Sequence, residues 1–134
     1  MINTIIVDDE EYIRKIIKKL LNKENVVTFE ASNYNEFIEI FNDINLEGKI
    51  VTAIFLDYTL KENESERIIE YLLSINNRPK ICLMSGLPTD EIKNGIYFDY
   101  YIYKPDLNRS VEIILKNFED REKENNKSNQ DGKS

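Results

Sequence analysis

Histidine is absent from this chain of 134 residues. Without imidazole there is no histidine general base, no Ser-His or Cys-His nucleophile pair, and none of the commonest zinc ligand. Any chemistry must therefore use carboxylates, hydroxyls and lysines. The natural cofactor for such oxygen ligands is Mg²⁺, and Mn²⁺ is possible in its place.

Cysteine, glycine and proline are also scarce. The single cysteine, Cys82, cannot form an intramolecular disulfide, so a reducing cytoplasm is the expected location. Four glycines and three prolines disfavour a loop-rich fold. Met1 leads directly into a β-like run without a basic segment, and no apolar run approaches the ~18 residues of a membrane span, so we expect no signal peptide and no membrane contact.

Basic residues are outnumbered, with 18 Lys and Arg against 25 Asp and Glu and a net charge of −7. Binding of a nucleic-acid backbone needs a basic face, so we expect no direct nucleic-acid partner. The length fits one domain with a single sizeable core.

Apolar, β-branched runs alternate with helical patterns along the chain, which predicts an α/β fold with a doubly wound, five-stranded parallel sheet. The expected strands are Thr4–Val7, Val26–Phe29, Ile50–Leu56, Lys80–Met84 and Tyr100–Tyr103. The expected helices cover residues 12–21, 37–44, 65–73, 88–95 and 107–118, with Ser65 as the cap of the third. No apolar residue follows Phe118, so we expect a domain over residues 1–118 and a disordered polar tail over residues 119–134.

Chemically active side chains follow four of the expected strands. They are Asp8 and Asp9 after the first strand, Asp57 after the third, Ser85 after the fourth, and Lys104 after the fifth. Parallel sheets bind ligands at the carboxyl ends of their strands. Three clustered carboxylates would repel one another strongly without a divalent cation, and a carboxylate can itself accept a phosphoryl group. The neighbouring Glu10 and Glu11 are expected only to begin the next helix at its favourable end.

This ordered set, which ends in Lys104-Pro105, resembles the signature of the receiver domains of two-component response regulators, in particular their single-domain chemotaxis- and sporulation-type form. The resemblance covers about Thr4 to Phe118. It implies a flavodoxin-like (βα)5 fold with strand order 2-1-3-4-5. It also implies a signalling domain that takes phosphoryl from the phosphohistidine of a histidine kinase, or from a phosphotransfer protein. Such a domain is not an enzyme beyond its own phosphorylation and dephosphorylation.

The resemblance assigns roles residue by residue. Asp57 is the implied phosphoacceptor and a metal ligand. Asp8, Asp9 and the backbone carbonyl of Thr59 complete the implied Mg²⁺ site. Lys104 is implied to pair with a phosphoryl oxygen, and the peptide bond between Lys104 and Pro105 is implied to be cis.

The resemblance also implies a switch. Ser85 would donate its hydroxyl to the phosphoryl group, and Tyr101 would turn inward as Ser85 moves. The surface offered to a downstream protein partner would be the face of helix 88–95, strand Tyr100–Tyr103 and helix 107–118. Thr59 and Leu87 occupy the positions that tune dephosphorylation in this family, and bulky Leu87 is expected to shade the acyl phosphate from water.

The sequence departs from the family at three places. Leu60-Lys61 and Ser65 replace the usual Met-Pro and Gly, Tyr97-Phe98 replaces a Gly-Ala pair, and the gap from Ser85 to Lys104 is short. Three alternatives stay open: a receiver cut from a longer regulator with an output domain, a small Mg-dependent phosphohydrolase with an aspartyl-phosphate intermediate, and a receiver that binds a partner without phosphorylation. Against the hydrolase, Thr59 stands where such enzymes usually place a second acid.

Overall fold

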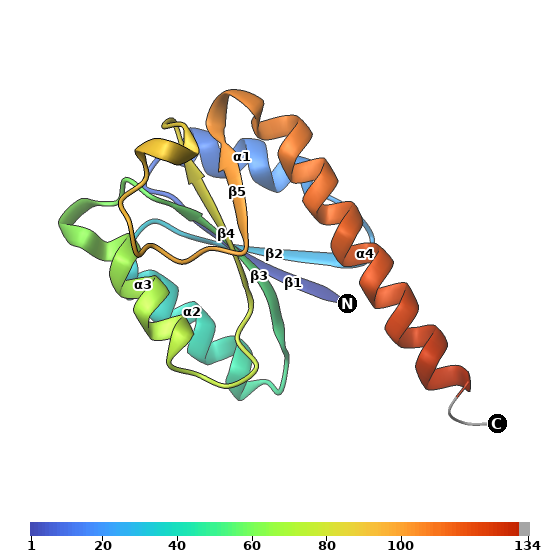
Figure 1. Cartoon of the computed structure of the whole chain (residues 1–134). Helices are drawn as coiled ribbons and strands as arrows, with labels where there is room; N and C mark the ends of the chain where they lie inside the picture. The colour runs from blue at the N-terminus through green and yellow to red at the C-terminus, as the bar shows by residue number, and fades with distance from the viewer. Residues whose placement is uncertain (132–134) are drawn as a thin grey trace.

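The computed structural model describes the backbone of residues 1–131 and the side chains of residues 1–125. Its centre is a sheet of five parallel strands in the order β2-β1-β3-β4-β5 (Figure 1), which confirms the predicted fold class and strand order. The strands are β1 Ile2–Val7, β2 Val26–Ala31, β3 Val51–Asp57, β4 Lys80–Ser85 and β5 Tyr100–Tyr103.

Strand β3 is the central strand, and its composition explains its place. Ile54, Phe55 and Leu56 are consecutive and all fully buried. Since successive side chains of a strand point to opposite faces, a strand buried throughout must be covered on both faces. The sheet therefore has an apolar core on each side.

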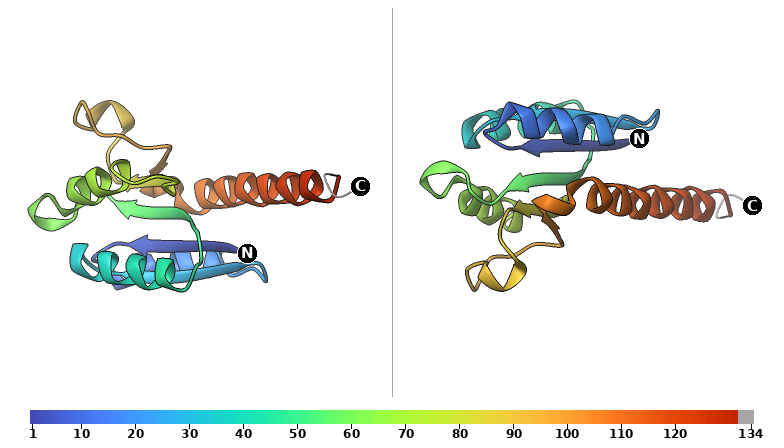
Figure 2. Two further views of the ribbon diagram at one scale, coloured as in Figure 1. Left: turned by 90° about the horizontal axis from the view of Figure 1, so that it is seen from below. Right: turned by 90° about the horizontal axis from the view of Figure 1, so that it is seen from above.

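Within the described residues, four α-helices cover the sheet: α1 Glu11–Leu20, α2 Tyr34–Leu46, α3 Glu64–Leu73 and α4 Leu107–Asp131. Helices α2 and α3 pack on one face, where Phe37 and Phe41 contact Tyr71 edge-on. Helices α1 and α4 pack on the other, through Ile17 and Val111 among others. Figure 2 shows the molecule from below and from above, with α4 extending past the amino ends of the strands.

The prediction of a helix over residues 88–95 is wrong. Between β4 and β5 the chain forms one short 3-10 turn, η2 Thr89–Glu91, and otherwise irregular backbone. Two features explain this. Pro88 and Gly95 limit the segment to about two turns, too few to nucleate a helix in water without strong packing, and Gly95 takes a φ of 91°, which right-handed helix excludes. The output face predicted from that helix therefore lacks it.

The last helix is longer than predicted. Helix α4 runs without a break from Leu107 to Asp131, where disorder was expected after Phe118. Residues 119–125 are mostly Glu, Lys, Arg and Asn, and the first three are good helix formers that extend a helix already anchored by packing. The amino group of Met1 also pairs with Glu122. The remaining tail residues 132–134 lie outside the described residues.

None of the helices within the described part of the chain combines the length and the apolar character that crossing a membrane requires.

Candidate functional site

The candidate site lies at the carboxyl edge of the sheet. Asp8 follows β1 directly, Asp57 ends β3, Ser85 ends β4, and Lys104 follows β5. Asp8, Asp57 and Ser85 are each at most 1% exposed. Burial of three polar residues at one edge is costly unless they interact, so their partners define the site.

Lys104 joins the two buried carboxylates. Its Nζ lies 3.2 Å from Oδ1 of Asp57 and 3.4 Å from Oδ2 of Asp8. Burial acts to lower the pKa of Lys104, but the charges of Asp57 and Asp8 outweigh it and raise that pKa above its usual value. The lysine is therefore held charged between the two acids.

The Asp8 carboxyl group is only partly stabilised by its surroundings. Burial raises its pKa to about 6, with the charge of Asp57 adding to the effect, although the Glu10 N–H and Lys104 act against it. One oxygen, Oδ1, accepts a hydrogen bond from the Glu10 N–H at 2.9 Å. The other oxygen, Oδ2, accepts no hydrogen bond from any described residue. Among the described residues, Lys104 is the only one that forms an ion pair with Oδ2.

Carboxylate oxygens of Asp8, Asp9 and Glu10 all lie within 4.8 Å of one another. Asp9 and Glu10 are exposed, whereas Asp8 is buried. A buried carboxylate oxygen without a donor, beside two further carboxylates, fits a hard divalent cation that prefers oxygen ligands and keeps part of its water. The residues present thus suit Mg²⁺ or Mn²⁺.

Asp57 is held by the residues that follow it. The Thr59 N–H donates to Oδ1 at 3.2 Å, and the Thr59 hydroxyl lies 3.0 Å from Oδ1 and 3.3 Å from Oδ2. Ser65 does not cap α3 as predicted, because that helix begins one residue earlier, at Glu64. Its buried hydroxyl instead donates to the backbone carbonyl of Asp57 at 2.5 Å.

Ser85 and Tyr101 are connected through one residue. The hydroxyl oxygen of Ser85 accepts a hydrogen bond from the Leu87 N–H at 3.0 Å, and the Tyr101 hydroxyl donates to the Leu87 carbonyl. The Tyr101 ring also packs on Phe98, with ring centres 5.5 Å apart. The peptide units around Leu87 therefore link the strand end at Ser85 to the aromatic residue on β5.

The peptide bond between Lys104 and Pro105 is trans, not cis as the resemblance implied. Trans is the more common form of bonds that precede proline. Lys104–Asp106 form a 3-10 turn, η3, that leads directly into α4.

Sequence reasoning missed three contributions to this edge. Glu10 precedes α1 and adds its carboxylate to the acidic cluster. The Thr59 hydroxyl contacts the Asp57 carboxylate, a contact that was not predicted. Arg14 donates to the Asp8 carbonyl at 2.7 Å and pairs with Glu30 at 3.3 Å. The run of four acids signalled Glu10, but nothing in the sequence alone placed Arg14 or the Thr59 hydroxyl.

A scan against models of protein families finds no match, but individual known proteins are similar to this chain. The chain is 34% identical over 123 residues to the NtrX-like response regulator of Rickettsia bellii, and 32% identical over 116 residues to the transcriptional regulatory protein SrrA of Staphylococcus aureus. These alignments cover 87% and 84% of this chain but only 24% and 45% of the relatives, so the chain spans less than half of each.

Solved structures show the same fold. The receiver domain protein from Methanospirillum hungatei has a TM-score of 0.70 at 22% identity, and the alignment covers 92% of this chain and 98% of that one. Its strand order and these solved structures show that the chain has the fold of response regulator receiver domains, and its sequence is similar to that of longer response regulators.

Proposed function

We propose that the chain is a phosphoacceptor signalling domain in which Asp57 takes a phosphoryl group from the phosphohistidine of a histidine kinase or a phosphotransfer protein. The observation that carries the proposal is the buried pair of acids around Lys104, with 3.2 Å to Asp57 and 3.4 Å to Asp8. A structural turn would not need three buried or partly buried charges at the edge where parallel sheets bind ligands.

The nucleophile in this proposal is Oδ2 of Asp57. Oδ1 accepts hydrogen bonds from Lys104 and Thr59, whereas Oδ2 has only the longer Thr59 contact at 3.3 Å among the described residues. Oδ2 attacks phosphorus, and the O–P bond forms as the N–P bond of the phosphohistidine breaks. The electron pair of that bond leaves with the imidazole nitrogen, which takes up a proton. Lys104 neutralises charge on the transferred group.

Asp8, Asp9, Asp57 and the Thr59 carbonyl would hold Mg²⁺, or Mn²⁺, with Glu10 close enough to contribute directly or through water. When bound, the cation supplies charge neutralisation to the phosphoryl oxygens. Two response regulators of the same fold support this part of the proposal. One, from Burkholderia pseudomallei, was solved with a phosphorylated aspartic acid and a calcium ion, and Rcp1 was solved in a Mn²⁺-bound form.

Phosphorylation would change the conformation of the loop between β4 and β5. If Ser85 turns its hydroxyl toward a phosphoryl oxygen, its bond with the Leu87 N–H is lost, and the contact between Leu87 and Tyr101 is free to change with it. Leu87 and Tyr97 are 37% and 39% exposed on this loop, so its rearrangement would alter the surface met by a downstream protein. A cytoplasmic location is part of the proposal, since a receiver of this kind meets its kinase there.

The test is intact-protein mass spectrometry after incubation with acetyl phosphate. We expect one phosphoryl group per chain, dependent on Mg²⁺, and none in Asp57→Asn. Sustained release of phosphate from varied monoesters would instead identify a phosphohydrolase. If wild-type protein neither binds Mg²⁺ nor gains mass, the chain is a partner-binding receiver that is not phosphorylated.

A further inference from the structure

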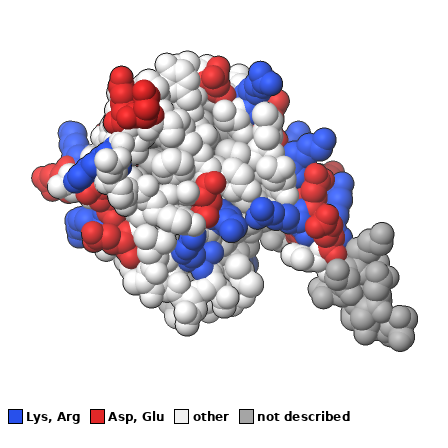
Figure 3. All heavy atoms as spheres, viewed as in Figure 1, with Lys and Arg blue, Asp and Glu red and all other residues white. Residues whose placement is uncertain are grey.

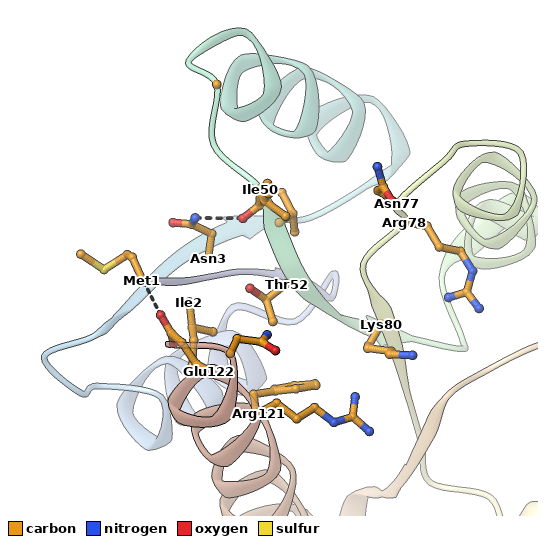
Figure 4. Close-up of a pocket in the computed structure, with 14 residues that line it drawn as sticks. Met1, Ile2, Asn3, Ile50, Thr52, Asn77, Arg78, Lys80, Arg121 and Glu122 are labelled. Atoms are coloured by element: carbon orange, nitrogen blue, oxygen red, sulfur yellow. Dashed lines mark hydrogen bonds and ion pairs between the residues drawn. The ribbon is translucent and has the colours of Figure 1, made fainter. Parts of the chain in front are cut away.

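The opposite end of the sheet holds a cavity of about 530 Å³. Its walls come from the start of β1, the turn into β3, the turn into β4, and the part of α4 that extends past the sheet (Figure 4). This size lies within the range of small-molecule pockets, roughly 300–1,000 Å³. The cavity is far along the strands from Asp57, so it is separate from the site described above.

Basic side chains dominate the charged part of the cavity. Arg78, Lys80 and Arg121 line it, against one acid, Glu122. Figure 4 shows Lys80 reaching out from β4 and Arg121 from α4 toward the same opening. Figure 3 shows Lys and Arg side chains mixed with Asp and Glu where α4 leaves the body of the molecule, so the basic excess is confined to the cavity lining. In a chain of net charge −7, such a local excess of positive charge is unexpected.

The internal pairs leave two of these cations without a partner in the described chain. Arg78 pairs with Asp99 at 3.0 Å, and Glu122 pairs with the amino group of Met1. Within residues 1–125, neither Lys80 nor Arg121 takes part in any ion pair. Two like charges aimed at one cavity repel, and an anion between them removes that repulsion.

The rest of the lining combines apolar side chains with the polar side chains of Asn3, Thr52, Asn77 and Asn125. Ile2, Val51 and Phe118 form buried parts of the wall, and Ile50 is 74% exposed beside it. The pocket therefore offers an apolar surface next to two cations. An inorganic anion would use only the charged half of this lining, whereas an organic anion would use both.

We propose that this cavity binds a small organic phosphate, with the phosphate between Lys80 and Arg121 and an apolar or aromatic body against Val51 and Phe118. A phosphate monoester carries close to two negative charges at neutral pH, which matches two cations better than a single carboxylate does. Arginine also binds phosphate through paired N–H donors. This proposal does not depend on phosphorylation of Asp57.

The test uses adenosine 5′-monophosphate as the probe and the ¹⁵N-labelled full chain, with EDTA present so that no metal bridges the probe to the acidic edge. We expect amide shifts at Thr52, Lys80 and Arg121, no shifts at Asp9 or Thr59, and a dissociation constant below about 1 mM. Inorganic phosphate and adenosine should each bind at least about tenfold more weakly, because each uses half of the lining. Asp57→Asn should bind the probe as wild type does.

Lys80→Gln and Arg121→Gln should each weaken binding about tenfold, the usual effect of losing one charge-assisted hydrogen bond. The matched control is Lys116→Gln, an exposed lysine on α4 that does not line the cavity. Absence of shifts in wild type, shifts confined to the acidic edge, equal binding of inorganic phosphate, or unchanged binding in both cavity variants would each overturn the proposal.

Discussion

At the carboxyl end of the sheet, Asp8 and Asp57 contact one lysine and Asp9 lies beside Asp8, whereas at the amino end Arg78, Lys80 and Arg121 share a cavity with one glutamate. Each end holds an internal pair that neutralises part of its charge, Lys104 with the acids at one end and Arg78 with Asp99 at the other. After these pairs form, acidic groups remain in excess at the carboxyl end and basic groups remain in excess at the amino end. The net charge of −7 describes neither end, because folding separates the charges along the strands.

The largest change should follow removal of the lysine at the acidic end. Lys104→Met leaves two buried carboxylates without their cation, so we expect phosphorylation by acetyl phosphate to slow by about 100-fold or more. The free energy of unfolding in urea, without metal, should fall by about 2–3 kcal/mol, less than for a fully buried pair because Lys104 is 19% exposed.

Added Mg²⁺ should restore part of that stability, since a second cation can then face the acids. Lys116→Met, at an exposed position on α4, serves as the control. A Lys104 variant with wild-type rate and stability would show that the contacts at 3.2 and 3.4 Å carry no function.

The next effect is that of pH on Asp8. Burial raises its pKa to about 6, so the folded protein binds this proton more tightly than the unfolded chain. Its contribution to stability is therefore present below about pH 4 and is lost as pH rises through 6. Without metal, Asp8→Asn should gain stability relative to wild type over that window, by about 1–2 kcal/mol after allowance for solvent screening.

Metal binding should show the opposite pH dependence. Mg²⁺ needs the ionised carboxylate, so its affinity should fall as pH drops through 6, and Asp8→Asn should remove most of the affinity at every pH. Isothermal titration across this range measures both. A wild-type affinity that stays constant from pH 5 to 7 would contradict the role given to Asp8.

An effect of similar size is expected at the pair of Arg78 and Asp99, which neutralises part of the basic end. Asp99 accepts hydrogen bonds from Arg78, Tyr97 and the Ile81 N–H, so Asp99→Asn should cost about 1–2 kcal/mol of unfolding free energy. Burial acts to raise the pKa of Asp99, but these donors outweigh it and lower that pKa. The stabilisation is therefore present above about pH 4 and is lost as the pH falls through the lowered pKa.

The Asp99→Asn variant also tests the charge of the basic end, because it leaves Arg78 without its acidic partner. Binding of adenosine 5′-monophosphate should tighten a few-fold as the protein becomes less stable. Asp90→Asn, at an exposed acid in η2, should change neither quantity. Weaker probe binding in Asp99→Asn would mean that Arg78 orientation matters more than its charge.

The smallest effect is expected at Leu87, which is 37% exposed beside Ser85. If its side chain shades the acyl phosphate from water, Leu87→Ala should lose phosphate a few-fold faster than wild type after the phosphodonor is removed. The decay of the phosphorylated mass with time measures this rate. A slower decay in the variant would reject the shading role.

Prediction from the sequence was most accurate where packing and local pattern agree. All five strands were located, and Tyr100–Tyr103 was given its observed bounds. Strand β1 gained Ile2 and Asn3 at its start, where the Asn3 side-chain amide donates to the Ile50 carbonyl, a contact between residues far apart in the sequence. Prediction was wrong over residues 88–95, where Pro88 and Gly95 outweigh a weak helical pattern, and after Phe118, where propensity extends an anchored helix.

The residue pattern alone predicted a parallel sheet and the set of residues at its carboxyl edge, whereas the strand order was implied by the family resemblance. Alternating patterns specify a parallel sheet, and a parallel sheet brings the residues after its strands to one edge. Only the tertiary structure decided that Ser65 bonds the Asp57 carbonyl and that Leu87 connects Ser85 with Tyr101. It alone also brought Lys80 and Arg121 to one cavity. These contacts depend on side-chain directions, which periodicity and motif spacing do not encode. The cavity also depends on the approach of Lys80 and Arg121, which lie far apart in the sequence.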